Sequence, residues 1–206
     1  MTANRINNNY FIVNNIVDQV FFETPIRVKG DPEFFHISSL DERQKNIKLL
    51  MNGFANAQKT IPTIKLHIIG DSRKKEELCK IISELSLENN ILFHGEKSGE
   101  ELVKIIEKST ALILTSRYEN MPVVISEALA LGKPVISTRV GGIPEHINEE
   151  RGILFTNESV EELSSAIIEM ISRSSYNPID LREYAKEQFS ENKVGEKLYE
   201  ISKRYG

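Results

Sequence analysis

The regular alternation of short apolar runs with amphipathic helical patterns restricts the fold of this chain more than any other feature of its sequence. Apolar runs of this length, bounded by turn residues, are typical of buried parallel strands. The strands that we predict cover residues 34–38, 66–70, 91–93, 111–115, 135–138 and 152–155. Strands that alternate with helices predict an α/β fold with a doubly wound parallel sheet, whose ligands bind at the carboxyl ends of the strands.

Helical patterns fill the segments between these strands. After the first strand, apolar residues recur at helical spacing at Ile47, Leu50, Met51, Phe54 and Ala57. Two later helices are expected to begin at capping boxes, Ser98-x-x-Glu101 and Ser159-x-x-Glu162. Further helical patterns follow residue 155, and the last of them covers about 191–205.

The composition is that of one ordinary globular domain, because 40% of the 206 residues are hydrophobic and 27% are charged. We predict that residues 31–206 form this domain and that residues 1–30 are a linker or a remnant of an interdomain segment, in which residues 10–29 form an edge strand or a linker. The net charge of −4 argues against a nucleic-acid partner, which would require a clustered basic face.

Cysteine usage and hydropathy favour a cytoplasmic protein. Cys79 is the only cysteine, so no internal disulfide can form, and its place in a helical pattern predicts a small core residue. The first nine residues do not form a signal peptide, and no apolar stretch reaches the length of about 18 residues that a membrane span needs. Peripheral contact with the inner face of the membrane is left open.

Several common ligand motifs are absent from the sequence, namely G-x-G-x-x-G after a strand, the P-loop and the G-x-S-x-G elbow. No D-x-D occurs, which disfavours a metal-bound diphosphate, and we predict no metal or other cofactor. The histidines are scattered, and each is most simply interpreted as a core or rim residue, although those in or beside strands could converge. His94 is retained as a candidate because it lies at the carboxyl end of its predicted strand, directly before Gly95, where this fold places its ligand.

The most informative segment is the loop and helix over residues 115–134. Pro122 lies where the first turn of the helix should begin, and the free amides of a helix start bind phosphate well. Glu119 and Glu127 flank this helix start. Because a diphosphate would repel both carboxylates, the pair makes chemical sense only if it faces hydroxyl groups, as a sugar nucleotide offers on its ribose and its sugar.

A structural interpretation competes with this functional one. Other glutamates, such as Glu76 and Glu84, have the same separation. Glu119 could merely complement the helix dipole, and Glu127 could be a solvated surface residue. Without further information the two interpretations are about equal.

A set of motifs in a characteristic order favours the functional interpretation. They are SSL (38–40), KN (45–46), IGD (69–71), FHG (93–95), YENMP (118–122), EALA (127–130), GKPVIST (132–138) and GGIPE (141–145). Together they resemble the signature of the group 1 retaining glycosyltransferases, whose GT-B architecture has two Rossmann-like domains with a cleft between them. The resemblance covers nearly the whole chain from about residue 14.

The resemblance implies a role for each matching position. Glu127 would accept hydrogen bonds from the ribose hydroxyls, and Glu119 would contact hydroxyls of the donor sugar. Lys45 would neutralise the diphosphate and assist departure of the nucleotide. The main chain around Asn120, Met121, Pro122 and Val123 would face the sugar and the diphosphate, and the loop with Gly70 and Asp71 would also line the donor site. The backbone at Phe93, His94 and Gly95 would hold the base.

This chain departs from the family pattern at two places. Ser39 stands where many relatives have an arginine beside the lysine, which leaves Arg43 as a substitute from the same loop. Ser72 follows Asp71 where a glycine is frequent, and it would stiffen or tilt that loop. Phosphate binding is therefore less firmly predicted than ribose binding.

By resemblance, the chain is the carboxyl-terminal, donor-binding half of such an enzyme. About thirty residues precede the first predicted strand, too few for an acceptor domain, and residues 10–22, with the motif at 14–18, resemble the linker that enters the second domain. We expect an amino-terminal acceptor domain to act in cis or in trans. Alone, the chain should bind the donor better than it turns it over.

The function that we expect is binding of a UDP- or GDP-sugar for retaining, metal-independent transfer of a hexose, in polysaccharide or glycolipid biosynthesis. One alternative is a GT-B epimerase that rearranges its nucleotide sugar. Another is a non-catalytic nucleotide-sugar-binding or regulatory module.

Overall fold

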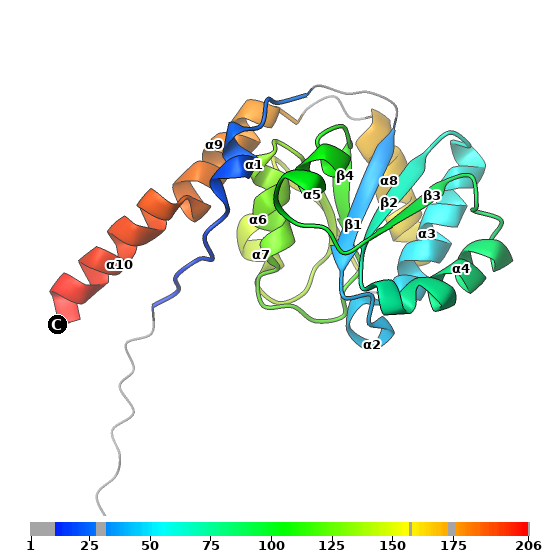
Figure 1. Ribbon diagram of the computed structural model, residues 1–206, viewed down its shortest axis with the longest axis horizontal. Coiled ribbons are helices and arrows are strands. Elements are labelled where there is room, and N and C mark those ends of the chain that lie inside the picture. The colour runs from blue at the N-terminus through cyan, green and yellow to red at the C-terminus, as the bar shows by residue number, and fades with distance from the viewer. Residues whose placement is uncertain (1–10, 28–31, 157, 173–175, 206) are drawn as a thin grey trace, which may run out of the picture.

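The chain folds around one parallel sheet with helices on both faces. The computed structural model describes residues 11–27, 32–156, 158–172 and 176–205. Its six strands are parallel and lie in the order β3-β2-β1-β4-β5-β6 (Figure 1). They are β1 (Glu33–Ser38), β2 (Lys65–Gly70), β3 (Ile91–Gly95), β4 (Ala111–Leu114), β5 (Val135–Thr138) and β6 (Gly152–Phe155). The predicted doubly wound sheet is confirmed.

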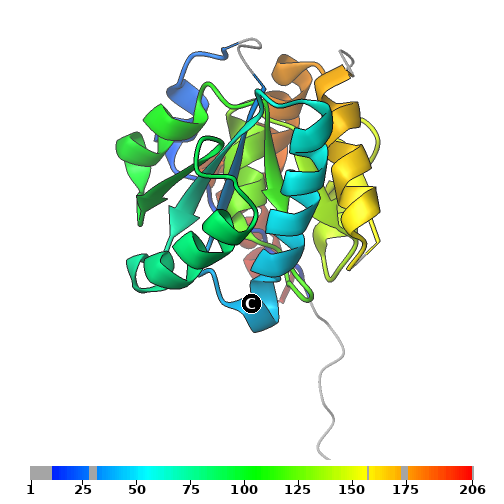
Figure 2. The ribbon, with the colours of Figure 1, turned by 90° about the vertical axis from the view of Figure 1, so that its right-hand side faces the viewer.

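The helices form two layers. One layer covers one face with α3 (Ile47–Thr60), α4 (Lys75–Glu84) and α8 (Val160–Ser172), and Figure 2 shows α3 and α8 side by side. The other face is covered by α1 (Gln19–Glu23), α5 (Gly99–Ile106), α6 (Val123–Ala130) and α9 (Pro178–Phe189). The remaining elements are α2 (Glu42–Lys45), the 3-10 helix η1 (Ser72–Lys74), α7 (Ile143–His146) and α10 (Glu191–Tyr205).

The predicted apolar face of α3 is buried, from Ile47 to Ala57. This helix packs closely on α8, since a Cβ atom at Gly53 would lie only 2.4 Å from a methyl carbon of Leu163. The close approach therefore requires glycine at this position of α3. This contact holds α3 and α8 together in one helix layer. The candidate site begins near the start of α3.

Some sequence predictions need correction. Residues 11–27 contain the short helix α1 and no edge strand; Asp18 caps α1, and Phe21 and Phe22 are buried against the second layer. Cys79 is exposed rather than a core residue, because α4 buries Leu78 and Ile82 instead. The boundary expected between residues 30 and 31 lies outside the described residues, as do residues 1–10.

The two predicted capping boxes differ in the structure. Both helices begin where predicted, at Gly99 and Val160. The Ser98 side chain makes no cap hydrogen bond, whereas the Ser159 hydroxyl accepts one from the Glu162 amide at 3.1 Å. The Glu162 carboxylate bonds to the Thr156 amide instead of closing the box.

The carboxyl ends of the strands lie at one edge of the sheet, toward the bottom of Figure 1, where α2 is found. The loops after β1, β2, β4 and β5 reach this edge. Helix α10 extends away from the sheet at the left of Figure 1. Among the helices of the described residues, none combines the length and apolar character that crossing a membrane requires.

Candidate functional site

The structure brings together the two residues predicted to be catalytic. Lys45 ends α2, Glu119 lies in the loop after β4, and the Lys45 ammonium donates a hydrogen bond to Glu119 Oε1. The Ser116 hydroxyl donates to the same oxygen at 2.7 Å. Their side chains are only 14% and 9% exposed, so solvent screens this ion pair weakly.

A cavity of about 310 Å³ opens beside this pair at the carboxyl edge of the sheet. It lies between the loop after β1 and the start of α6, so a ligand there would contact both. Its lining consists of Ile37, Ser38, Ser39, Gln44, Lys45, Leu114, Glu119, Pro122, Val123 and Val124. Among the predicted donor-site residues, Ser39, Pro122 and Val123 therefore share one cavity with Lys45 and Glu119.

The start of α6 supplies amide dipoles to this cavity. Pro122 occupies the N-cap rather than the first helical position, and no side chain caps the helix. The Ile125 amide bonds to the Pro122 carbonyl, whereas the amides of Val123 and Val124 meet no acceptor within the described part of the chain. Such amides favour an anion.

Glu127 lies one turn into α6 and is half-buried. Burial raises the pKa of its carboxyl group to about 7, and the negative charge of Asp18 adds to the shift. Within the described residues its carboxylate accepts no hydrogen bond. Glu127 is therefore not the solvated surface residue that the structural interpretation assumed.

The loop that carries Glu119 rests on the turn after β5. The Gly142 amide donates to the Asn120 carbonyl at 2.7 Å. Gly141 has a φ of 54°, and a Cβ atom there would lie 1.6 Å from the Glu119 carbonyl oxygen, so only glycine fits. Met121, the next predicted residue, packs against the apolar layer that contains α6.

Arg43 and Asp71 belong to a second hollow, of about 750 Å³. Ser39 and Gln44 line both hollows. The Arg43 side chain is 91% exposed and lies 3.7 Å from Asp41, so it does not stand beside Lys45. Asp71 pairs with Arg73, and the Arg73 guanidinium beside it lowers the pKa of the Asp71 carboxyl group.

Gly70, the last residue of β2, packs against the loop after β1. A Cβ atom at this position would lie 2.3 Å from the Ser38 carbonyl oxygen and 2.8 Å from the Leu40 side chain. Its contribution is therefore close packing under the loop that leads to Lys45.

The predicted base-binding segment, Phe93 to Gly95, ends β3 and lines neither hollow. His94 Nε2 lies 2.9 Å from His67 Nδ1, and the two rings stack. Burial lowers the pKa of His94, and the neighbouring His67 and Lys97 lower it further. Two strand histidines thus converge, as the sequence allowed.

His36 lies apart from these rings and is fully buried. It bonds to the Ile113 carbonyl at 2.8 Å and to the Ser38 hydroxyl at 2.7 Å. Burial lowers its pKa to about 4, so the ring is neutral at pH 7.

Sequence reasoning assigned no role to several polar residues at the end of β4. The Thr115 hydroxyl donates to the Lys45 carbonyl, the Ser116 hydroxyl contacts Glu119, and Arg117 contacts α2. Their position directly after a buried strand was the available signal, because side chains there reach the ligand edge of the sheet. In the described ranges, no three side chains of the metal-binding types gather into a group.

Comparisons with known proteins identify the family and the fold of this chain. The family model "Glycosyl transferases group 1" matches residues 19–188. The lipopolysaccharide 1,6-galactosyltransferase of Salmonella typhimurium is 30% identical over 144 residues, which are 68% of this chain and 39% of that protein.

Solved structures match over most of the chain. The apo form of the lipopolysaccharide outer core galactosyltransferase WaaB has a TM-score of 0.76 and 25% identity over 94% of this chain and 56% of that one. A Staphylococcus aureus TarM mutant in complex with fondaparinux, alpha-GlcNAc-glycerol and UDP has a TM-score of 0.80 and 22% identity over 93% of this chain and 39% of that one. The chain therefore spans 39% to 56% of the length of these three proteins.

Proposed function

Because this chain belongs to the group 1 glycosyltransferases and has the fold of one GT-B domain, we propose that it binds the nucleotide-sugar donor of a retaining glycosyltransferase. The proposed donor is a UDP- or GDP-sugar. The observation that carries the proposal is the Lys45–Glu119 pair at a cavity on the ligand edge of a parallel sheet.

The cavity offers the positive groups that a diphosphate needs. Lys45, Val123 and Val124 line it, and the amides of Val123 and Val124 lie at the positive end of the α6 dipole. We propose that these groups hold the diphosphate and stabilise the negative charge on the departing nucleotide, without a metal ion. Lys45 is then a catalytic residue because it touches the leaving group.

The two glutamates are proposed to contact hydroxyl groups. Glu119 is buried beside Lys45 and would accept hydrogen bonds from the transferred sugar. The Glu127 carboxylate, one turn into α6, has no hydrogen-bond partner among the described residues and would accept hydrogen bonds from the ribose. The ends of β2 and β3, with Asp71 and His94, would border the nucleotide farther from the reacting bond.

The setting of the reaction is proposed from relatives. Two of them are named for lipopolysaccharide, and we propose that the full protein acts in polysaccharide or glycolipid assembly. An amino-terminal acceptor domain, in cis or in trans, would supply the acceptor. Such an enzyme would work in the cytoplasm or at the inner face of the membrane.

Calorimetric titration of the purified chain with UDP, GDP and their sugar conjugates tests the proposal, with and without EDTA. One nucleotide should bind, and Glu127→Ala should weaken binding by roughly 1 to 3 kcal/mol, the cost of leaving the ribose hydroxyls without their hydrogen-bond partner. The exposed Glu84 on α4 provides the matched control, Glu84→Ala. Failure of the folded chain to bind any of these compounds, or binding that EDTA abolishes, contradicts the proposal. Product analysis of the same mixtures for isomerised sugar tests the epimerase alternative.

A further inference from the structure

Lys45 sits on a helix of a single turn, which makes the position of its ammonium group sensitive to the backbone below it. Helix α2 has four residues, Glu42 to Lys45, and Asp41 caps its start by accepting from the amides of Arg43 and Gln44. A helix this short is not stable by itself, because its last carbonyl groups have no partners within the helix.

Two residues at the end of β4 supply partners to these carbonyl groups. The Arg117 amide donates to the Gln44 carbonyl at 2.8 Å, and the Arg117 guanidinium donates to the carbonyls of Glu42 and Arg43. The Thr115 hydroxyl donates to the Lys45 carbonyl at 2.8 Å. Every carbonyl group of α2 therefore accepts a hydrogen bond from the segment that leads to Glu119.

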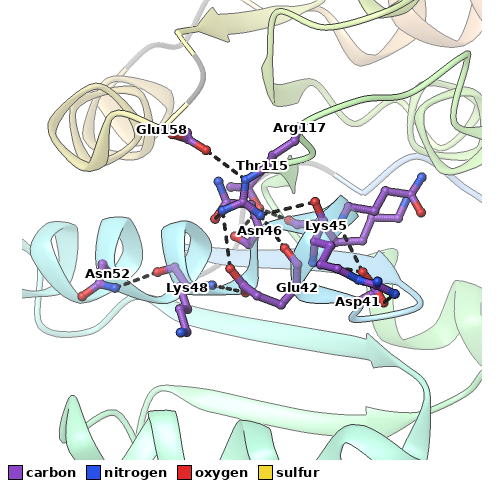
Figure 3. A network of polar contacts seen from close by, with 11 residues as sticks. Asp41, Glu42, Lys45, Asn46, Lys48, Asn52, Thr115, Arg117 and Glu158 are labelled. Carbon is purple, nitrogen blue, oxygen red and sulfur yellow. Dashed lines mark hydrogen bonds and ion pairs between the residues drawn. The ribbon is translucent and has the colours of Figure 1, made fainter.

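The guanidinium group also fixes how α2 ends. Asn46 follows α2 in a left-handed conformation, with a φ of 51°, and its side-chain oxygen accepts from Arg117 Nη2 at 2.9 Å (Figure 3). Left-handed backbone is unfavourable for most residues, and asparagine tolerates it better than most. This bond favours the sharp change of direction between α2 and α3.

A third segment holds the guanidinium group in place. Arg117 Nε donates to Glu158 Oε1 at 2.9 Å, and Glu158 follows β6. Glu42 contributes a weaker ion pair at 3.6 Å and accepts from the Lys48 amide of α3. Because these contacts occupy the donors of Arg117, its side chain is directed at the protein backbone rather than at the cavity of Lys45.

We propose that Arg117 is a positioning residue, which fixes α2 against the loop after β4 and thereby sets the Lys45 ammonium beside Glu119 and the diphosphate subsite. The effect on Lys45 follows from the contacts of Arg117 with α2, Asn46 and Glu158 alone. The effect on nucleotide binding rests on the proposed function.

Lysine acetylation followed by mass spectrometry tests the first effect on the full chain. In the wild type, Lys45 should react about tenfold more slowly than Lys80, whose side chain is 70% exposed, because a paired, buried amine is protected. Arg117→Ala should remove most of this difference, and Arg117→Lys, which keeps the charge but not the fork of donors, should remove part of it. Persistent protection of Lys45 in a folded Arg117→Ala protein overturns the proposal.

Arg151 provides the matched control, since its guanidinium also donates to a backbone carbonyl, that of His146, far from α2 in the fold. Arg151→Ala should leave the acetylation of Lys45 unchanged. Faster acetylation of Lys45 in both variants would mean that a general loss of stability exposes Lys45, and not the loss of the contacts that hold α2.

A double-mutant cycle with UDP tests the second effect. Arg117→Ala should weaken UDP binding about tenfold when Lys45 is present, and less than about twofold in a Lys45→Ala background, because coupled residues are not additive. An equal loss in both backgrounds means that Arg117 does not act through Lys45. If the wild type does not bind UDP, UDP fails as the proposed nucleotide, while the acetylation result still decides whether Arg117 positions Lys45.

Discussion

The ammonium group of Lys45 and the carboxylate of Glu119 form a nearly buried ion pair that joins α2 to the loop after β4. Each charge thus has a partner within the protein. A diphosphate that binds beside Lys45 would compete with Glu119 for the ammonium group. A donor sugar that offers hydroxyls to Glu119 would compensate for the loss, so the pair links recognition of the two parts of one ligand.

This linkage predicts that Glu119→Gln affects two ligands differently. UDP should bind roughly fivefold more tightly, because the variant frees Lys45 and removes a repelling charge, a gain of about 1 kcal/mol. UDP-glucose should gain less or bind more weakly, because the amide is a poorer acceptor for sugar hydroxyls. Calorimetry at low and high salt measures both affinities, with Glu84→Gln as the control. Weaker UDP binding by Glu119→Gln would contradict the competition.

Glu127 should make folding less favourable as pH rises. Burial raises the pKa of its carboxyl group to about 7 in the folded chain, against 4.5 for a free side chain. Between pH 4.5 and 7 the folded state therefore holds a proton that the unfolded state has lost, so stability falls as pH rises across this window. Glu127→Gln should abolish this component, which amounts to roughly 1 to 3 kcal/mol. Urea unfolding of both proteins at pH 5 and pH 8 measures it. An equal change in the free energy of unfolding of the two proteins between these pH values would show that the carboxyl group titrates normally.

The sheet could be predicted because its signals are local. The runs at 135–138 and 152–155 coincide with β5 and β6, since apolar residues bounded by turns have few other stable places. β3 continues to Gly95 beyond the predicted residue 93, because a bulge in its pairing with β2 lets the strand extend. The ligand edge follows from the parallel topology alone. The choice of Lys45 rests on the family resemblance, and Glu119 is indicated by its place beside the start of α6 together with that resemblance.

The contacts that hold α2 in place could not be predicted, because they depend on tertiary geometry. Nothing local indicates that Arg117 faces the carbonyl groups of α2, or that Asn46 adopts a left-handed conformation that needs a partner. Arg43 is closer to Lys45 in sequence than Arg117 is. Its side chain nevertheless points to the larger hollow, because the turn of α2 separates Arg43 from Lys45. Sequence distance within a helical turn is a poor guide to which side chains share a cavity.

His36 should make the chain sensitive to acid. Burial lowers the pKa of its ring to about 4, against 6.5 for a free histidine. Between pH 6.5 and pH 4 the unfolded state binds a proton that the folded state does not, so stability is lost as pH falls across this window, by up to about 3 kcal/mol. His36→Asn should cost stability at pH 7 but flatten this part of the pH profile. Chemical denaturation at pH 4.5 and pH 7 provides the comparison, and an unchanged slope in the variant would assign the acid sensitivity to other groups.

Thr115 and Thr110 offer a matched pair for measuring what the support of α2 contributes to stability. The Thr115 hydroxyl donates to the carbonyls of Lys45 and Asn46, whereas the buried Thr110 hydroxyl has no hydrogen-bond partner among the described residues. Threonine and valine have nearly the same shape, so Thr115→Val leaves the Lys45 carbonyl without its partner and should cost roughly 1 to 3 kcal/mol. Thr110→Val removes a hydroxyl that is buried without compensation and should be neutral or stabilising. Equilibrium unfolding in urea measures both variants against the wild type. Equal losses in the two variants would mean that the hydrogen bond of Thr115 adds nothing to stability.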